Sequence, residues 1–255
     1  MRLLILTKRS LLSVAFCCVI GAVAAVIAVS SGVKAVQTAA EPREVPIYRV
    51  ENDKKQVAIS FDAAWGNEQT EELLDILDRY HVKATFFLVG DWVDKYPEDV
   101  KSIAAHGCDI GNHSDTHPHL PTLGLSGISG EIESCNDKIK ALTGSCPRLF
   151  RPPYGDYDNN VVKTVKGLGM YCVQWDVDSL DWKDPTPAQM KRTVLDKLQS
   201  GSIVLMHNGA KNTPVALPSI IEGIQDKGYE IVLIKDLIPE GEYYTDVQGE
   251  MHLVS

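Results

Sequence analysis

Two histidines of this sequence, His113 and His117, are four residues apart, so both imidazole rings can bind a single metal ion. Other side chains suited to hydrolysis lie elsewhere along the chain: Asp62, Arg151, Asp178, Asp181 and His207. A carboxylate can take a proton from water, a histidine can give one to a leaving group, and an arginine can hold a carboxylate ionised. This combination of residue types indicates a hydrolytic reaction.

The elements that must position these side chains follow from the hydrophobic pattern, which predicts strands and helices in alternation. Strands are expected at Gln56–Asp62, Ala84–Val89, Cys108–Asn112, Leu149–Arg151, Tyr171–Val177, Ser202–Met206 and Tyr229–Ile234. Helices are expected at Glu68–Tyr80, Trp92–His106, Ile128–Thr143, Asn159–Leu168, Ala188–Gln199 and Leu217–Lys227. This alternation predicts a parallel α/β architecture, and about 190 residues suit a small, distorted seven-stranded (β/α) barrel. The candidate residues fall at strand ends, where such barrels gather their catalytic groups.

Length and charge narrow the class of protein. With 255 residues, the chain has room for one domain with a full core but not for a second globular domain. The formal net charge is −9, and no run rich in lysine and arginine is present to neutralise a phosphate backbone. We therefore expect a single domain, treated as a monomer, with no nucleic-acid partner.

The N-terminal segment, residues 1–36, differs in composition from the rest of the chain. Arg2, Lys8 and Arg9 precede an apolar run from Leu11 to Val29. A run of about 19 apolar residues can cross a bilayer as a helix, and the positive flank predicts that the N-terminus stays inside. We expect a single-pass transmembrane helix that holds an extracytoplasmic domain at the cell membrane.

A cleaved signal peptide is the alternative, because small residues between Ala35 and Ala40 offer a cleavage site, and the domain would then be secreted. After this segment, a polar stretch with Pro42 and Pro46 is typical of a spacer. The expected boundaries are 37–55 for the spacer, 56–238 for the catalytic domain and 239–255 for a C-terminal tail.

The candidate residues belong to five short motifs in a fixed order. They are Ser60-Phe61-Asp62-Ala63, His113-Ser114-Asp115-Thr116-His117, Arg151-Pro152-Pro153-Tyr154, Asp178-Ser179-Leu180-Asp181-Trp182 and Leu205-Met206-His207. This series resembles the motifs of the polysaccharide deacetylase family, the family 4 carbohydrate esterases built on a NodB-like domain. The resemblance extends from about Val57 to Leu237, and the pattern Phe-Asp-x-x-Trp-Gly is most similar to the sporulation-associated branch.

The resemblance implies metal-assisted hydrolysis of N-acetyl groups on amino sugars of cell-wall glycan, in peptidoglycan or spore cortex. It implies that His113 and His117 bind a divalent metal ion, most simply zinc. Asp62 would be the general base, His207 the general acid, Arg151 the cation that keeps Asp62 ionised, and Asp181 the partner that orients His207. Tyr154 would donate its backbone N–H to the oxyanion, and Trp182 and Leu205 would form the walls of the acetyl pocket.

One position departs from the family pattern, because Ala63 stands where the family has a second aspartate that binds the metal. Asp62 could serve as third ligand instead, or Asp115, Asn67 or Glu68 could substitute. The loss of a ligand also supports a different hypothesis, in which the domain has lost catalysis and binds glycan or a partner without turnover. A peptidase-type metallohydrolase is disfavoured because the sequence lacks His-Glu-x-x-His.

Overall fold

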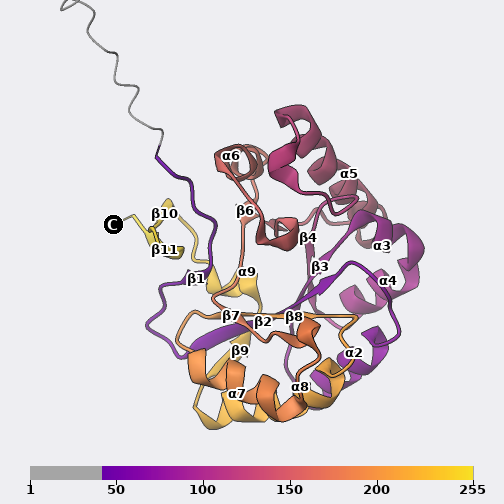
Figure 1. Ribbon diagram of the computed structural model, residues 1–255, viewed down its shortest axis with the longest axis vertical. Helices are drawn as coiled ribbons and strands as arrows, with labels where there is room; N and C mark the ends of the chain where they lie inside the picture. Colours follow the sequence, from indigo (N-terminus) through magenta and orange to yellow (C-terminus); the bar gives the residue numbers. More distant parts are fainter. Residues whose placement is uncertain (1–41, 255) are drawn as a thin grey trace, which may run out of the picture. The chain divides into compact units, whose positions relative to one another are not determined.

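The structure, a computed structural model, describes residues 42–254, and the expected membrane segment lies outside them. Within the described residues, a parallel sheet is surrounded by helices (Figure 1). Its strands are β2 (Gln56–Ala63), β3 (Thr85–Leu88), β4 (Asp109–Asn112), β5 (Leu149–Phe150), β6 (Tyr171–Cys172), β7 (Val177–Asp178), β8 (Ile203–His207) and β9 (Glu230–Val232). Seven of these strands follow the order β6-β5-β4-β3-β2-β8-β7, and β9 pairs with the beginning of β2.

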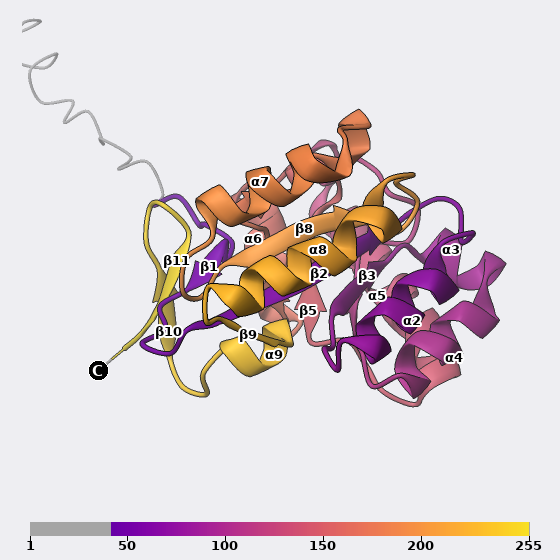
Figure 2. The same ribbon diagram turned by 90° about the horizontal axis from the view of Figure 1, so that it is seen from below.

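The helices alternate with the strands, as the sequence predicts. The α-helices are α2 (Thr70–Arg79), α3 (Gly90–Lys95), α4 (Pro97–Ala105), α5 (Leu125–Thr143), α6 (Asn159–Gly167), α7 (Pro187–Lys197), α8 (Thr213–Asp226) and α9 (Ile234–Leu237). Short 3-10 turns are η1 (Leu120–Thr122), η2 (Pro153–Gly155) and η3 (Asp181–Lys183). Helices α7 and α8 lie side by side along β8 (Figure 2). None of the helices between residues 42 and 254 is long and apolar enough to cross a membrane.

Strand β2 lies inside the sheet, between β3 and β8, and every one of its residues from Val57 to Ala63 is buried. One of its edges pairs with β3 and the other with β8, both in parallel register, so that Asp62 lies opposite His207. A strand buried on both faces reads as a continuous apolar run, which is why Val57–Phe61 was recognisable in the sequence. The same register brings the first and last motifs of the chain to one end of the sheet.

The prediction of one strand at Tyr171–Val177 was wrong. The structure has two short strands there, and they lie at opposite edges of the sheet, because β6 pairs with β5 whereas β7 pairs with β8. The intervening residues bond outside the ladder: Gln174 N–H donates to the Ile47 carbonyl, and the Asp176 carboxylate accepts from Ser202 Oγ and Ile203 N–H. This link runs from one edge strand to the other, and the sheet is an α/β half-barrel rather than the expected barrel, with seven parallel strands in one order and β9 added beside β2.

The single helix expected at Trp92–His106 is likewise divided. Helix α3 ends at Lys95 and α4 begins at Pro97. Proline has no backbone N–H to continue a helix, but its fixed φ suits the first helical position. The break therefore follows from Pro97.

A second, smaller sheet forms from the two ends of the described chain. Strand β1 (Arg49–Val50) pairs in parallel with β11 (Glu250–Leu253), which pairs antiparallel with β10 (Tyr243–Thr245). The three strands lie together beside the main sheet (Figure 1). These elements come from the ranges that the sequence assigned to a spacer and a C-terminal tail.

Candidate active site

A pocket of about 470 Å³ opens at the carboxyl end of the sheet. It is lined by Asp62, Ala64, Trp65, His113, His117, Tyr154, Trp175, Asp178, Trp182, Leu205 and His207. The candidate residues that the sequence singled out come from different strand ends, and most of them meet here because parallel strands deliver their ends to one edge. Arg151 and Asp181 lie behind the pocket wall, each bonded to a residue that lines it.

His113 and His117 point their Nε2 atoms at each other across 3.3 Å. His113 Nδ1 lies 2.7 Å from the Arg151 carbonyl oxygen, which accepts a hydrogen bond and so leaves the lone pair on Nε2. The two residues lie on a turn after β4 rather than on a helix. Positive φ angles at Ser114 (68°) and His117 (60°) bend the chain so that both rings face the same point.

Both histidines are suited to bind a metal because burial favours their neutral form. Burial lowers the pKa of His113 despite the nearby Asp62 carboxylate. Burial and the neighbouring His113 lower the pKa of His117 to about 4. Neutral imidazoles with converging lone pairs are what a zinc site requires. The pair fits a divalent ion.

Asp62 and Arg151 form a buried ion pair. Arg151 Nη1 donates to Asp62 Oδ1 at 2.7 Å, and Nη2 donates to Ser60 Oγ and to the Gln174 carbonyl. The guanidinium also lies 4.0 Å above the Phe87 ring. Burial alone would raise the pKa of Asp62, but the Arg151 cation together with the nearby histidines lowers it overall. Asp62 is therefore held ionised, which is the form that a general base needs.

His207 and Asp181 form the second pair. Asp181 is fully buried, and its carboxylate accepts from the backbone N–H of His207 and from Thr213 Oγ1 while contacting His207 Nδ1 at 2.7 Å. Burial would lower the pKa of His207, but the hydrogen bond and charge of Asp181 raise it above its ordinary value. Asp181 fixes the ring so that Nε2 is free to act on the pocket side, and it favours the protonated form of a general acid.

The predicted substrate-binding residues all line the pocket. Tyr154 lies in turn η2 with a positive φ of 60°. The Gly155 N–H donates to the Pro152 carbonyl, whereas the Tyr154 N–H makes no backbone hydrogen bond within the described residues. Tyr154 and Trp182 are 62% and 55% exposed, although His119 stacks on the Tyr154 ring and Lys183 Nζ lies 4.5 Å from the centre of the Trp182 ring. Leu205 is almost fully buried and contributes an apolar wall.

Ala63 is fully buried within the main hydrophobic cluster. The proposed replacements for the missing aspartate are engaged elsewhere: Asp115 with Lys138 and Ser134, and Asn67 with Asp99. Glu68 is exposed and, like the other two, is not among the residues that line the pocket. Asp62 is the carboxylate nearest the histidines, with Oδ2 3.5 Å from His113 Nε2. Of the alternatives, Asp62 alone contacts a histidine of the pair, but among the described residues Asp62, His113 and His117 are not close enough together to form a three-ligand group.

The sequence missed three contributors to this site. Trp175 lines the pocket with its ring 5.5 Å from the Arg151 guanidinium. His119 stacks on Tyr154 with ring centroids 4.3 Å apart, and its Nδ1 contacts Asp156 at 3.0 Å. Trp65 was noted only as part of a pattern, yet its ring lies beside both His117 and His207. None of these three residues belongs to a sequence pattern whose spacing indicates a catalytic or metal-binding role.

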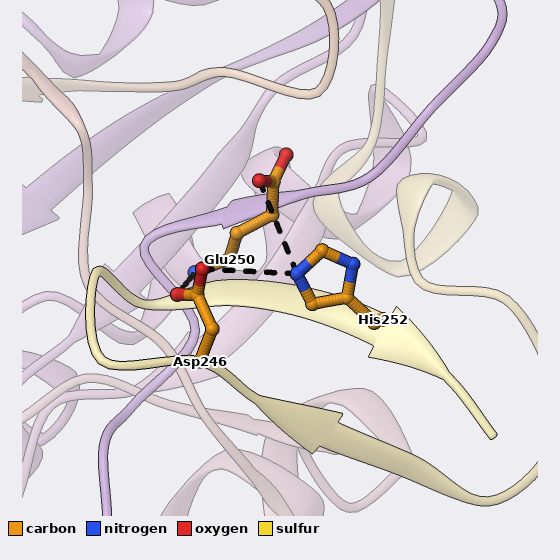
Figure 3. A group of neighbouring side chains, drawn as sticks. All are labelled: Asp246, Glu250 and His252. Carbon is orange, nitrogen blue, oxygen red and sulfur yellow. Dashed lines mark hydrogen bonds and ion pairs between the residues drawn. The ribbon is translucent and has the colours of Figure 1, made fainter.

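Asp246, Glu250 and His252 form a separate cluster on the C-terminal hairpin (Figure 3). His252 Nε2 lies 3.8 Å from Asp246 and 3.9 Å from Glu250, but Glu250 already pairs with Arg49 at 2.6 Å. A hydrogen bond to Glu51 raises the pKa of His252, which favours its charged form over a metal-binding one. The cluster is an ion-pair network that holds the hairpin to β1.

Comparisons with known proteins agree with this geometry. The family model for polysaccharide deacetylase matches residues 49–173. The chain is 38% identical over 195 residues to Bacillus subtilis YlxY, covering 76% of this chain and 61% of that protein. It is 34% identical over 189 residues to the peptidoglycan-N-acetylglucosamine deacetylase of Bacillus cereus, covering 72% of this chain and 69% of that enzyme. The chain thus spans less than two thirds of the length of YlxY.

Among solved structures, the fold is similar to that of Bacillus anthracis BA3943, described as a CE4 family pseudoenzyme. The TM-score is 0.74 at 38% identity, covering 76% of this chain and 69% of that chain. A mutant of the same protein, described as having restored enzymatic activity, matches with the same TM-score at 39% identity, covering 76% of this chain and 71% of that one. From the five motifs, the half-barrel and these relatives, we conclude that the chain belongs to the polysaccharide deacetylase family.

Proposed function

We propose that this protein hydrolyses the acetamide bond of N-acetylated amino sugars in cell-wall glycan. The observation that carries the proposal is the convergence of three pairs in one pocket: His113 with His117, Asp62 with Arg151, and His207 with Asp181. The first pair suits a metal ion, the second holds a base ionised, and the third holds an acid protonated. Amide hydrolysis needs all three functions.

A divalent ion, for which zinc is our proposal, would be held by His113 and His117, with Asp62 the nearest further ligand. When bound, it would supply Lewis-acid polarisation of the amide carbonyl. A catalytic zinc site ordinarily has three protein ligands. Because Asp62 must also act as base, we expect this site to bind zinc weakly.

The chain's own residues then divide the proton transfers. Asp62 takes a proton from the attacking water, and Arg151 keeps Asp62 ionised between turnovers. His207 gives a proton to the departing amine, and Asp181 stabilises its charged form. The Tyr154 N–H donates to the developing oxyanion. Trp182 and Leu205 form the apolar wall against the acetyl methyl group.

We take the substrate from the chemistry of the pocket and from the relatives. The Bacillus cereus relative is a peptidoglycan-N-acetylglucosamine deacetylase. The partly exposed rings of Tyr154 and Trp182 at the pocket offer apolar surface to a glycan chain that extends beyond the reacting sugar. We propose N-acetylated peptidoglycan as the substrate, with spore cortex as the form that the Phe-Asp-x-x-Trp-Gly pattern favours.

A second candidate function is glycan binding without turnover. The specific observation in its favour is Ala63, a fully buried apolar residue at the position of a family metal ligand. Similarity to a protein described as a pseudoenzyme supports the same reading. The two candidates differ in whether a metal is held and acetate released.

The test uses the purified full-length chain with and without zinc. Bound zinc is measured by elemental analysis, and acetate release is measured on an N-acetylglucosamine tetramer, with Asp62→Asn as the matched inactive control. Release that requires zinc and Asp62 supports deacetylation. Tetramer binding without release under saturating zinc supports the binding function.

We further propose that residues 1–36 anchor the protein in the cell membrane, with the domain outside the cell. The support is the apolar run Leu11–Val29 behind three basic residues. Fractionation of cells should recover the full-length chain with the membranes. Recovery of a soluble species beginning near residues 38–42 would show instead that the segment is a cleaved signal peptide.

A further inference from the structure

Trp65 is a large, solvent-exposed apolar residue that lies outside the five motifs and has no role in the proposed proton transfers. Its side chain is 58% exposed, although it lies at the mouth of the pocket. A single exposed apolar residue is ordinary on a protein surface, but Trp65 lines the pocket together with Asp62, His117 and His207. This position in the pocket, rather than exposure alone, makes Trp65 a candidate for contact with a substrate.

The orientation of Trp65 relates it to the catalytic side chains. Its ring is nearly parallel to that of His207, with an interplanar angle of 18° and centroids 6.4 Å apart. It is nearly perpendicular to His117, at 87° and 6.1 Å. The indole thus lies beside both His117 and His207, the proposed metal ligand and the proposed general acid.

The loop that carries Trp65 is fixed rather than free. Trp92 Nε1 donates to the Gly66 carbonyl at 2.6 Å, and Gly66 has a positive φ of 69° that turns the chain after Trp65. Gly209, two residues after His207, packs directly against Trp65. A Cβ atom at Gly209 would lie 2.8 Å from the Trp65 carbonyl oxygen and 3.3 Å from indole Cδ1.

We propose that Trp65 is a specificity-determining residue whose indole stacks on the apolar face of the pyranose ring that bears the reacting acetamide group. A pyranose exposes C–H groups on one face, and an indole offers a flat apolar surface of matching size. Stacking there directs the acetamide nitrogen toward His207. The inference deepens the proposed function and rests on it. Gly209 is the positioning residue that allows the indole to approach.

The first test measures binding rather than turnover, by calorimetry of an N-acetylglucosamine tetramer with the full-length chain. Trp65→Ala should weaken binding about tenfold, as expected for the loss of one stacked apolar face, while Trp65→Phe should restore most of the affinity. Tyr244→Ala is the matched control, because Tyr244 is 55% exposed but lies on the C-terminal hairpin outside the pocket. It should bind as the wild type does.

The second test examines positioning. Gly209→Ala should weaken tetramer binding, as Trp65→Ala does. The double variant should bind the tetramer little more weakly than Trp65→Ala alone. In steady-state acetate release, Trp65→Ala should raise KM more than it lowers kcat. Zinc affinity should be unchanged in all these variants, because His113 and His117 remain in place.

The outcomes separate this inference from the proposed function. If the wild type binds the tetramer and Trp65→Ala binds it equally well, the stacking role is overturned while deacetylation stands. If the wild type neither binds the tetramer nor releases acetate, both are overturned. Binding by the wild type that is lost in Trp65→Ala and kept in Trp65→Phe supports the stacking role even when no acetate is released.

Discussion

Introducing the missing carboxylate with Ala63→Asp tests whether position 63 belongs to the metal site. Asp62 reaches within 3.5 Å of His113 Nε2, and the family pattern has a metal-binding aspartate at the next position, so the variant asks whether a carboxylate at position 63 reaches the same histidines. Ala63 is also fully buried among apolar side chains, so without metal the new carboxylate has no cation partner. We expect the free energy of unfolding of the metal-free variant to be about 3 kcal/mol lower than that of the wild type.

Zinc should reverse this loss in the variant. A ligand present at 1,000 times its dissociation constant stabilises the folded state by about 4 kcal/mol. For a domain of this size, each kcal/mol corresponds to roughly 2–4 °C in melting temperature. Ala63→Asp should therefore melt well below the wild type in chelator and at or above it in zinc.

Thermal melts with and without zinc, together with calorimetric zinc titration, provide the measurement. Ala63→Asn is the control, because it has nearly the same shape but lacks the charge that makes a strong metal ligand. It should be destabilised without gaining a zinc response. The reasoning is refuted if zinc stabilises Ala63→Asp no more than it stabilises the wild type and Ala63→Asn, since position 63 would then not face the histidines.

Two further predictions concern catalysis. Asp62→Asn and His207→Ala should each lower kcat/KM on the order of 10²–10⁴-fold. The double variant should lower kcat/KM far less than the product of the two single effects, because the two groups act as one unit. Single effects that multiply in steady-state kinetics would argue against shared proton transfer. Because the pKa of His207 is raised above 6.5, its acid form should persist below that pH and be lost as the pH rises through the raised value. The contribution of the His207–Asp181 pair to the free energy of unfolding should likewise be lost as the pH rises through the raised pKa. Asp181→Asn should move the alkaline limb of the profile of kcat against pH to lower pH. A limb that does not move would exclude His207 as the acid.

Much of the site could be predicted from the sequence because several of its functional residues lie at the ends of buried strands. The apolar runs around β2 and β8 identified the strands, and parallel pairing then forced Asp62 and His207 to the same edge. The motif order supplied the remaining roles. The parallel α/β architecture was predicted for the same reason, since alternating strands and helices allow few arrangements, but the sequence predicted a barrel where the structure has a half-barrel.

The parts that were missed depend on contacts that sequence spacing does not encode. The division at residues 173–176 arises from side-chain bonds of Asp176 to a distant strand, so the segment has the composition of one strand but pairs as two. The convergence of His113 and His117 depends on positive φ angles in a turn, not on helical spacing. Trp65 and His119 gain their roles from ring packing across loops.

The central claim is amide hydrolysis, and acetate release tests it most directly. The wild-type chain, saturated with zinc and given the N-acetylglucosamine tetramer, should release acetate at a rate that falls to background in Asp62→Asn. Free amino groups should appear on the sugar in equal amount, because each hydrolysed acetamide yields one amine. No release above the Asp62→Asn background, with the tetramer still bound, would contradict the account.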